Sequence, residues 1–248
     1  MEFYEILPKI TAYIPEEKRS DCAVIIFAGG GYARRAPHEG MGYAEYLRDN
    51  GICAFDVAYR VAPDSFPAPL FDARYAVKWV RDNASKYGID KNKIAVMGSS
   101  AGGHLAALVS TYTKPIGATQ VDNIEDYLPN AQILCYPVIV NSVDNNYSHV
   151  GSYKNLLGEV TPESARDVDP VLNIDSTTPK SFIWHSVLDD CVDVQNSLDY
   201  VSKLHKENIP AELHIFPDGR HGIGLAVDFP QCGQWPQLLL NWLDKIFA

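Results

Sequence analysis

The sequence predicts an α/β fold in which a mostly parallel central sheet carries helices on both faces. Short apolar runs that end in Gly, Pro or polar residues alternate with longer segments of helical spacing, and this alternation is typical of strands and helices in a parallel sheet. Most of the short runs are continuously apolar, as expected of strands that helices cover on both faces.

The expected strands are these apolar, β-branched runs. They span residues 22–27, 52–58, 93–97, 132–136, 181–184 and 211–216. The expected helices lie at residues 41–50, 69–87, 101–112, 194–207 and 234–247. In the second of these helices an apolar face is formed by residues three or four apart, and Gly88 follows as a stop. The residues of that face are Leu70, Ala73, Val77 and Val80.

Two longer stretches, residues 113–129 and 141–179, are polar and rich in turn formers. We expect them to be excursions at the sheet edge, and segments of this length often line a binding site. No linker or shift in composition marks a domain boundary. Residues 1–248 are therefore predicted to form a single domain with one large core.

The composition argues against several classes of protein. A formal net charge of -10 argues against a nucleic-acid partner, because binding to phosphate chains needs a basic face. The five cysteines lie singly, so we expect buried reduced thiols and no metal site. No apolar stretch is long enough to span a membrane, and the first residues lack the pattern of a signal peptide. We expect a cytoplasmic protein without a membrane partner, and its oligomeric state, monomer or homo-oligomer, is left open.

The residues Gly98-Ser99-Ser100-Ala101-Gly102 lie between an expected strand and an expected helix. They fit the G-x-S-x-G pattern, in which the serine stands on a very tight strand-to-helix turn with its hydroxyl exposed. The glycines are needed because the backbone passes closely at these positions. A phosphate-binding turn is the alternative, but no Lys follows the glycines and the G-x-G-x-x-G spacing is absent. Ser100 is the predicted nucleophile.

A run of three glycines, Gly29-Gly30-Gly31, follows the first expected strand. Acyl transfer needs backbone N–H groups aimed at the carbonyl oxygen that becomes negative, and glycines let the backbone approach that oxygen. We expect the amides of Gly30, Gly31 and Ala101 to form this oxyanion hole. Flexible turns also contain glycine runs, which is the alternative interpretation.

A base and an orienting carboxylate should follow the nucleophile in the order Ser, Asp or Glu, His. Of the seven histidines, His221 lies on a glycine-flanked turn after the last expected strand. Asp189 and Asp190 follow the strand before it. All three residues lie just past the carboxyl ends of strands, where open α/β sheets place their sites. One aspartate should accept a hydrogen bond from the imidazole, and the residues alone do not decide which.

The sequence resembles the small acetyl esterases that are related to acetyl xylan esterases and to the hormone-sensitive-lipase group. Separate blocks carry this likeness, in the order found in those proteins, from about residue 24 to residue 242. The blocks are FAGGGY at 27–32, DVAYRVAP at 56–63, PAP at 67–69, GSSAGGHLA at 98–106, WHS at 184–186 and HG at 221–222. The resemblance implies an α/β-hydrolase fold with little or no cap. It also implies hydrolysis of short acyl esters, often acetyl groups on xylose-containing oligosaccharides.

The resemblance favours Asp189 over Asp190 as the acid. In such proteins the acid usually begins a D-x-x-V-P stretch, and Val192 fits only the frame that starts at Asp189. Two positions depart from the family pattern, because Asp193 stands where proline is usual and Ala28 stands where many relatives carry His before the glycines. Neither change removes a member of the expected triad.

The expected partner is a small-molecule ester, for which an acetylated oligosaccharide is one candidate, and this chemistry needs no metal or organic cofactor. Another hydrolase of the same fold, such as a peptidase or an arylformamidase, would share the triad and differ in its pocket. A catalytically silent binding scaffold is a further alternative, although the chain keeps every candidate residue. Residues 150–157 and 228–235 are expected at the rim of the site.

Overall fold

A computed structural model of the chain describes residues 6–117, 119–141 and 143–248. One seven-stranded sheet forms its centre, with the strand order β1-β3-β2-β4-β5-β6-β7. The strands are parallel except β1, which pairs antiparallel with β3. Their bounds are β1 Lys9–Tyr13, β2 Ala23–Phe27, β3 Cys53–Ala58, β4 Ile94–Ser99, β5 Ala131–Cys135, β6 Lys180–Ser186 and β7 Ala211–Phe216. The predicted fold class is confirmed.

The six strands expected from the sequence are present, each within two residues of its expected bounds. Strand β1 was not expected. Its residues are exposed or half-buried at the edge of the sheet, so it lacks the continuous apolar run by which the central strands are recognised.

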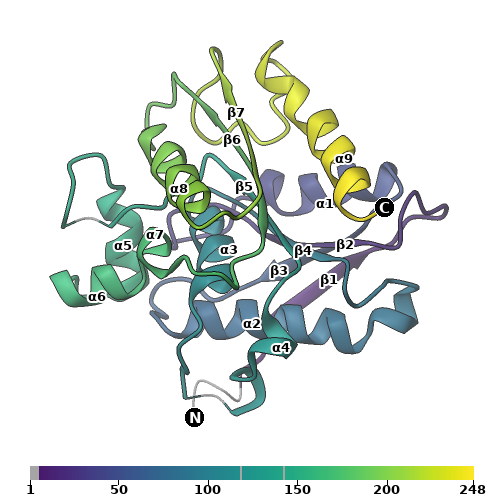
Figure 1. The fold of residues 1–248 in the computed structure, drawn as a ribbon, viewed down its shortest axis with the longest axis horizontal. Coiled ribbons are helices and arrows are strands. Elements are labelled where there is room, and N and C mark those ends of the chain that lie inside the picture. Colours follow the sequence, from purple (N-terminus) through teal and green to yellow (C-terminus); the bar gives the residue numbers. More distant parts are fainter. Residues whose placement is uncertain (1–5, 118, 142) are drawn as a thin grey trace.

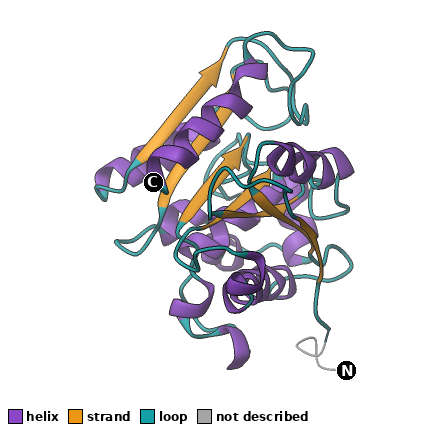
Figure 2. Cartoon of the chain, turned by 90° about the vertical axis from the view of Figure 1, so that its right-hand side faces the viewer, coloured by secondary structure: helices purple, strands orange, loops and turns teal. Residues whose placement is uncertain are grey.

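The long helices also lie where the sequence predicts them, on both sides of the strands (Figures 1 and 2). They are α1 Met41–Asp49, α2 Ala68–Asp82, α3 Ala101–Thr111, α8 Gln195–Lys206 and α9 Trp235–Ile246. The expected helix at 69–87 is two elements, because a 3-10 turn at Ala84–Tyr87 follows α2 after Asn83. Gly88 closes that turn in the left-handed conformation, with φ 58°.

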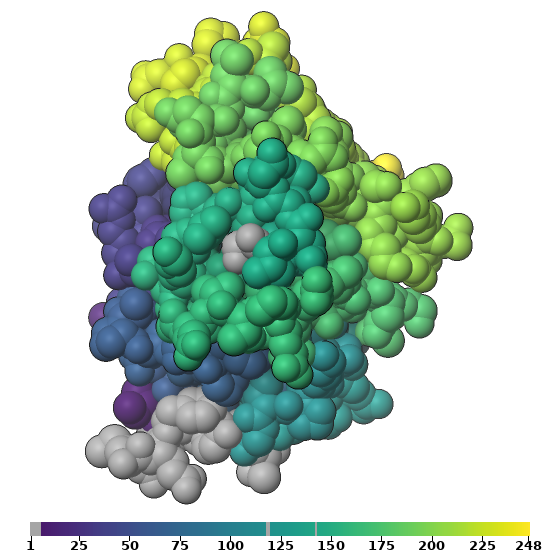
Figure 3. All heavy atoms as spheres, turned by 90° about the vertical axis from the view of Figure 1, so that its left-hand side faces the viewer, coloured from purple at the N-terminus to yellow at the C-terminus, as the bar shows by residue number. Residues whose placement is uncertain are grey.

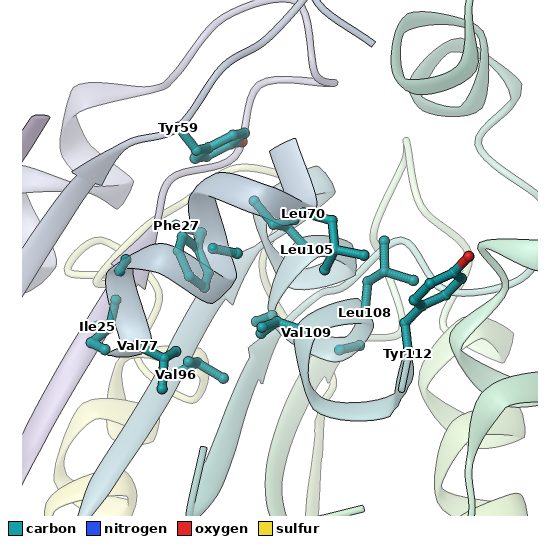
Figure 4. Packing of buried hydrophobic residues seen from close by; sticks show 14 of the residues in the cluster. Ile25, Phe27, Tyr59, Leu70, Val77, Val96, Leu105, Leu108, Val109 and Tyr112 are labelled. Carbon is teal, nitrogen blue, oxygen red and sulfur yellow. The ribbon is translucent and has the colours of Figure 1, made fainter. Parts of the chain in front are cut away.

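Two apolar cores, one on each face of the sheet, fill the space between the sheet and its helices, so the expectation of one large core was wrong. Successive residues of β2 point to opposite faces, so Ile25 and Phe27 join one core whereas Val24 and Ile26 join the other. The first core packs against α2, α3 and α8, and the second against α1 and α9. Figure 4 shows the first core, where side chains from β2 and β4 meet those from α2 and α3. The burial on both faces explains the continuous apolar runs.

The two polar stretches carry short helices that were not expected. Residues 113–129 contain α4 Ile124–Tyr127, and residues 141–179 contain α5 Val150–Leu157, α6 Pro162–Asp167 and α7 Pro170–Asn173. The first stretch leads from α3 to β5, and the second leads from β5 to β6. Both therefore end at strands in the interior of the sheet, and the expectation that they lie at its edge strands was wrong. Figure 3 shows the segment with α5 to α7 spread over one face of the molecule.

Within the described part of the chain, no helix has both the length and the apolar character that crossing a bilayer requires.

Replacement of Ile25 by Ala tests the two-faced core. Ile25 is fully buried, so Ile25→Ala should lower the free energy of unfolding by about 2–5 kcal/mol through lost burial and a cavity. Urea unfolding followed by circular dichroism measures this change. Leu172→Ala is the control, because Leu172 is 57% exposed and its truncation should change stability by no more than about 0.5 kcal/mol. Equal costs for the two variants would contradict this packing.

Candidate active site

Ser100 stands on the turn between β4 and α3. Its backbone has φ 53° and ψ -119°, a conformation that is strained for a residue with a side chain. The neighbouring glycines are required by contact, because a Cβ at Gly98 would clash with the carbonyl of Gly102, and one at Gly102 with the carbonyl of Phe27. The close backbone passage expected from the G-x-S-x-G pattern is therefore present.

The structure brings Ser100 together with the predicted base and acid. The Oγ of Ser100 lies 2.9 Å from Nε2 of His221. The Nδ1 of the same imidazole lies 2.8 Å from Oδ2 of Asp189. These three side chains come from the loops that follow β4, β6 and β7, which are far apart in the sequence and meet at the carboxyl ends of the parallel strands (Figure 1).

The two neighbouring aspartates have different contacts. The buried carboxylate of Asp189 contacts the imidazole, and its Oδ1 also accepts the backbone N–H of Cys191 at 2.9 Å and of Val192 at 2.8 Å. Asp190 instead accepts the backbone N–H of His221, at 3.3 Å. Asp189, which the family pattern favours, is thus the aspartate that contacts the imidazole, and it remains the predicted acid.

The surroundings of Asp189 keep its carboxyl ionised. Burial raises the pKa of this group, but hydrogen bonds from His185 and His221, the charge on His221 and the amide of Val192 lower it more, so the net pKa lies below the ordinary value. His185 contributes because its Nε2 lies 3.4 Å from Oδ2 of Asp189. A carboxylate that stays negative can hold the imidazole in one orientation and stabilise its protonated form.

The expected oxyanion amides lie beside Ser100. Gly30 and Gly31 have positive φ values of 135° and 66°, which favour glycine. Both line the cleft that Ser100 opens into. Ala101 is the first residue of α3, and the first N–H groups of a helix have no acceptor within it. These three amides remain the predicted oxyanion hole.

The cleft over Ser100 has a volume of about 610 Å³. Its walls come from the glycine loop, the turn before α1, the start of α5 and the segment after His221. The lining residues are Gly30, Gly31, Arg34, Ala36, His38, Glu39, Ser100, His149, Cys191, Arg220, His221, Gly222, Ile223, Ala226, Val227, Asp228 and Phe229. Of the two expected rim segments, 228–235 contributes two residues, whereas 150–157 lies beside the cleft and only its N-cap lines it.

His149 is that N-cap, and the sequence did not single it out. Its Nδ1 accepts the backbone N–H of Ser152 at 3.2 Å, so in a neutral ring the proton is on Nε2. Burial and the neighbouring His221 lower the pKa of His149. The cleft therefore contains a neutral imidazole that can donate a hydrogen bond.

Glu39 and Tyr136 were also missed. Both are buried beside the cleft, and the Tyr136 hydroxyl donates to Oε1 of Glu39 at 2.6 Å. A single carboxylate in a polar turn gives no local signal of burial, because its partners are distant in the sequence. No cluster of metal-ligating side chains occurs among the described residues.

Several known proteins are similar to this chain. The BD-FAE family matches residues 10–204. The solved structure of an acetyl ester-xyloside bifunctional hydrolase from Caldicellulosiruptor lactoaceticus is 41% identical, with a TM-score of 0.87, and the match covers 96% of this chain and 88% of that one. The resemblance seen in the sequence is confirmed.

Two longer curated proteins are also similar. Endo-1,4-beta-xylanase B of Butyrivibrio fibrisolvens is 33% identical, over 91% of this chain and 36% of that protein. An acetylxylan esterase of Xylanibacter ruminicola is 31% identical, over 97% of this chain and 48% of that protein. The chain thus spans half or less of the length of these two relatives.

Paired substitutions test the assignment of the acid. Asp189→Asn should slow phosphonylation of the protein by a fluorophosphonate probe by about 10³–10⁴-fold, because the imidazole loses its orienting charge. Asp190→Asn is the matched control, since its amide oxygen can still accept the backbone N–H of His221, and it should react within a few-fold of the parent. The reverse ranking, read by mass spectrometry of the labelled protein, would assign the acid to Asp190.

Proposed function

The chain belongs to the BD-FAE family, and we propose that it is a serine esterase that removes short acyl groups, chiefly acetyl, from xylo-oligosaccharides or similar sugars. The observation that carries this proposal is the continuous chain of contacts from Ser100 through His221 to Asp189 at the floor of an open cleft. A nucleophile, a base and an orienting acid in this order are the parts that acyl transfer needs.

In the proposed cycle, His221 accepts the proton of the Ser100 hydroxyl as Oγ attacks the ester carbonyl. The amides of Gly30, Gly31 and Ala101 hold the oxygen that becomes negative. Collapse of this intermediate breaks the bond to the alcohol, which leaves with the proton from His221, and the acyl group remains on Ser100. Water then attacks the acyl-enzyme with the same imidazole as base, and the free acid leaves.

The substrate class rests on the relatives and on the cleft. The relatives include proteins described as an acetylxylan esterase and as an acetyl ester-xyloside hydrolase. A cleft of about 610 Å³ has the size of sites that bind small organic ligands. Its polar lining, which includes Arg34, His149 and Arg220, offers several hydrogen-bond donors to the hydroxyl and ring oxygens of a sugar.

We also propose that the enzyme is cytoplasmic. The five cysteines are unpaired within the described residues, and reduced thiols are usual in that compartment. Four of them are buried, but Cys191 is exposed, so the expectation that it is buried was wrong. The net charge of -10 supports a small-molecule partner and not a nucleic acid.

Ser100→Ala tests the proposed nucleophile. The parent should release acetate from acetylated xylo-oligosaccharides and from a simple aryl acetate, and the variant should lose at least about 10⁴-fold of kcat because no acyl-enzyme can form. Acetate is measured with a coupled assay, and folding by circular dichroism.

Ser110→Ala is the control, because Ser110 lies on α3, the helix after the turn, and its hydroxyl donates to the carbonyl of Ala106 in the same helix. It should keep the activity of the parent. Turnover that survives in Ser100→Ala would overturn the assignment. Serine-dependent cleavage of the aryl ester alone would support the esterase activity but exclude the sugar substrate. That result is also the one expected of an arylformamidase or a peptidase.

A further inference from the structure

Glu39 is a buried carboxylate at the edge of the cleft, and the proposed mechanism does not use it. It lies in the 3-10 turn Pro37–Glu39, and only 3% of it is exposed. Its two oxygens bind different partners. Oε2 accepts the backbone N–H of Gly29 at 3.0 Å, and Oε1 accepts the hydroxyl of Tyr136 at 2.6 Å.

The first partner fixes the glycine loop. Gly29 directly precedes Gly30 and Gly31, whose amides are the expected oxyanion donors. The fit around Gly29 is close, because a Cβ there would clash with Oε2 of Glu39 and would lie 2.8 Å from the carbonyl oxygen of Ser99. The carbonyl of the preceding residue, Ala28, accepts the hydroxyl of Tyr59 at 2.6 Å. The start of the loop is therefore held at consecutive residues.

The second partner fixes the loop that carries the base. The hydroxyl of Tyr136 accepts the backbone N–H of Gly224 at 3.1 Å, three residues beyond His221. The Tyr136 ring also packs edge-on against the imidazole of His221, with 5.1 Å between the ring centroids. Tyr136 holds this position with φ 36° at the end of β5, which is strained for a side-chain-bearing residue.

A third contact joins this pair to the nucleophile turn. The hydroxyl of Tyr43 lies 2.8 Å from Oγ of Ser99 and 3.2 Å from the hydroxyl of Tyr136. Ser99 directly precedes Ser100. One buried chain of hydrogen bonds thus links Glu39, Tyr136, Tyr43 and Ser99. It reaches the glycine loop through Gly29, the loop of His221 through Gly224, and the turn of Ser100 through Ser99.

Removing a carboxylate from water costs several kcal/mol, and such a group persists in an interior when its oxygens are well bonded. Among the described residues, the basic side chain within 4.0 Å of its oxygens is the exposed imidazole of His38, whose Nε2 lies 3.9 Å from Oε1. Glu39 is therefore held by polar donors. Gly29 belongs to the glycine loop, and Tyr136 follows β5 and bonds in turn to the loop that carries His221.

We propose that Glu39 is a positioning residue of the enzyme. Through Gly29 it sets the direction of the oxyanion amides, and through Tyr136 it sets the position of the loop that carries His221. Because both oxygens belong to one rigid carboxylate, the two loops keep a fixed distance from each other. The inference rests on the proposed function, since it assigns Glu39 a role in the attack by Ser100.

Glu39→Gln tests this role with little change in volume. Gly29 N–H and Tyr136 O–H are both donors, and an amide has one acceptor oxygen, so one of the two links must reverse or break. We expect kcat per active site on an aryl acetate to fall by about 10–100-fold, with KM within about threefold, because the loss concerns donors that act on the developing negative charge. Active sites are counted by titration with a fluorophosphonate.

Tyr136→Phe provides a second variant that keeps the ring against His221 and removes only the hydroxyl. It should also lower kcat per titrated site. Tyr200→Phe is its matched control, because the Tyr200 hydroxyl is likewise buried, bonds to Gln132 at 3.0 Å and does not line the cleft. It should lower thermal stability without lowering kcat per site.

Binding of a tetrahedral mimic separates positioning from a merely structural role. A boronic acid that bonds to Ser100 should lose affinity for Glu39→Gln by a factor close to the loss in kcat. If Glu39→Gln and Tyr136→Phe melt at lower temperature but keep kcat per site and boronate affinity within twofold of the parent, Glu39 only supports the fold and the inference is wrong. If Ser100→Ala is itself active, the proposed function fails first, so the two failures are distinguishable.

Discussion

Ser100 has a backbone conformation that a residue with a side chain rarely adopts, with φ 53°, and the rest of the site is arranged around it. Strain of this kind costs about 1–3 kcal/mol and persists only where the surrounding structure enforces it. Here β4 and α3 hold the turn from both sides, and the contacts at Gly98 and Gly102 leave no room for a Cβ. The hydroxyl is thereby directed into the cleft toward His221.

The parallel sheet supplies the other parts because it brings the carboxyl ends of its strands to one edge. The glycine loop follows β2, the proposed nucleophile follows β4, the proposed acid follows β6 and the proposed base follows β7. In the sheet order β2, β4, β5, β6 and β7 are successive neighbours, so these loops converge. Strand β5 lies in the middle of this series, and the residue that follows it is Tyr136. Its hydroxyl bonds to Glu39, which holds the glycine loop after β2, and to the backbone of Gly224 in the loop after β7.

The sequence was sufficient where a constraint is local or periodic. Burial on both faces produced the apolar runs that predict the central strands, and close backbone contact produced the glycines around Ser100. The half-exposed edge strand β1 has no such pattern. The short helices α6 and α7 do begin at local capping signals, Thr161-Pro162 and Asp169-Pro170, but they are too short for an apolar period to show. Glu39 could not be found, because its partners are 10 and 97 residues away along the chain, and only the folded chain brings them together.

The central claim is that the acyl group passes through a covalent bond to Ser100. Rapid quenching of the enzyme with an excess of aryl acetate, followed by peptide mass spectrometry, tests this most directly. The account predicts a peptide that is acetylated on Ser100. Its rate of acetylation should be no slower than the steady-state rate of turnover. An adduct on another residue that forms and decays at the rate of turnover, with none on Ser100, would contradict it.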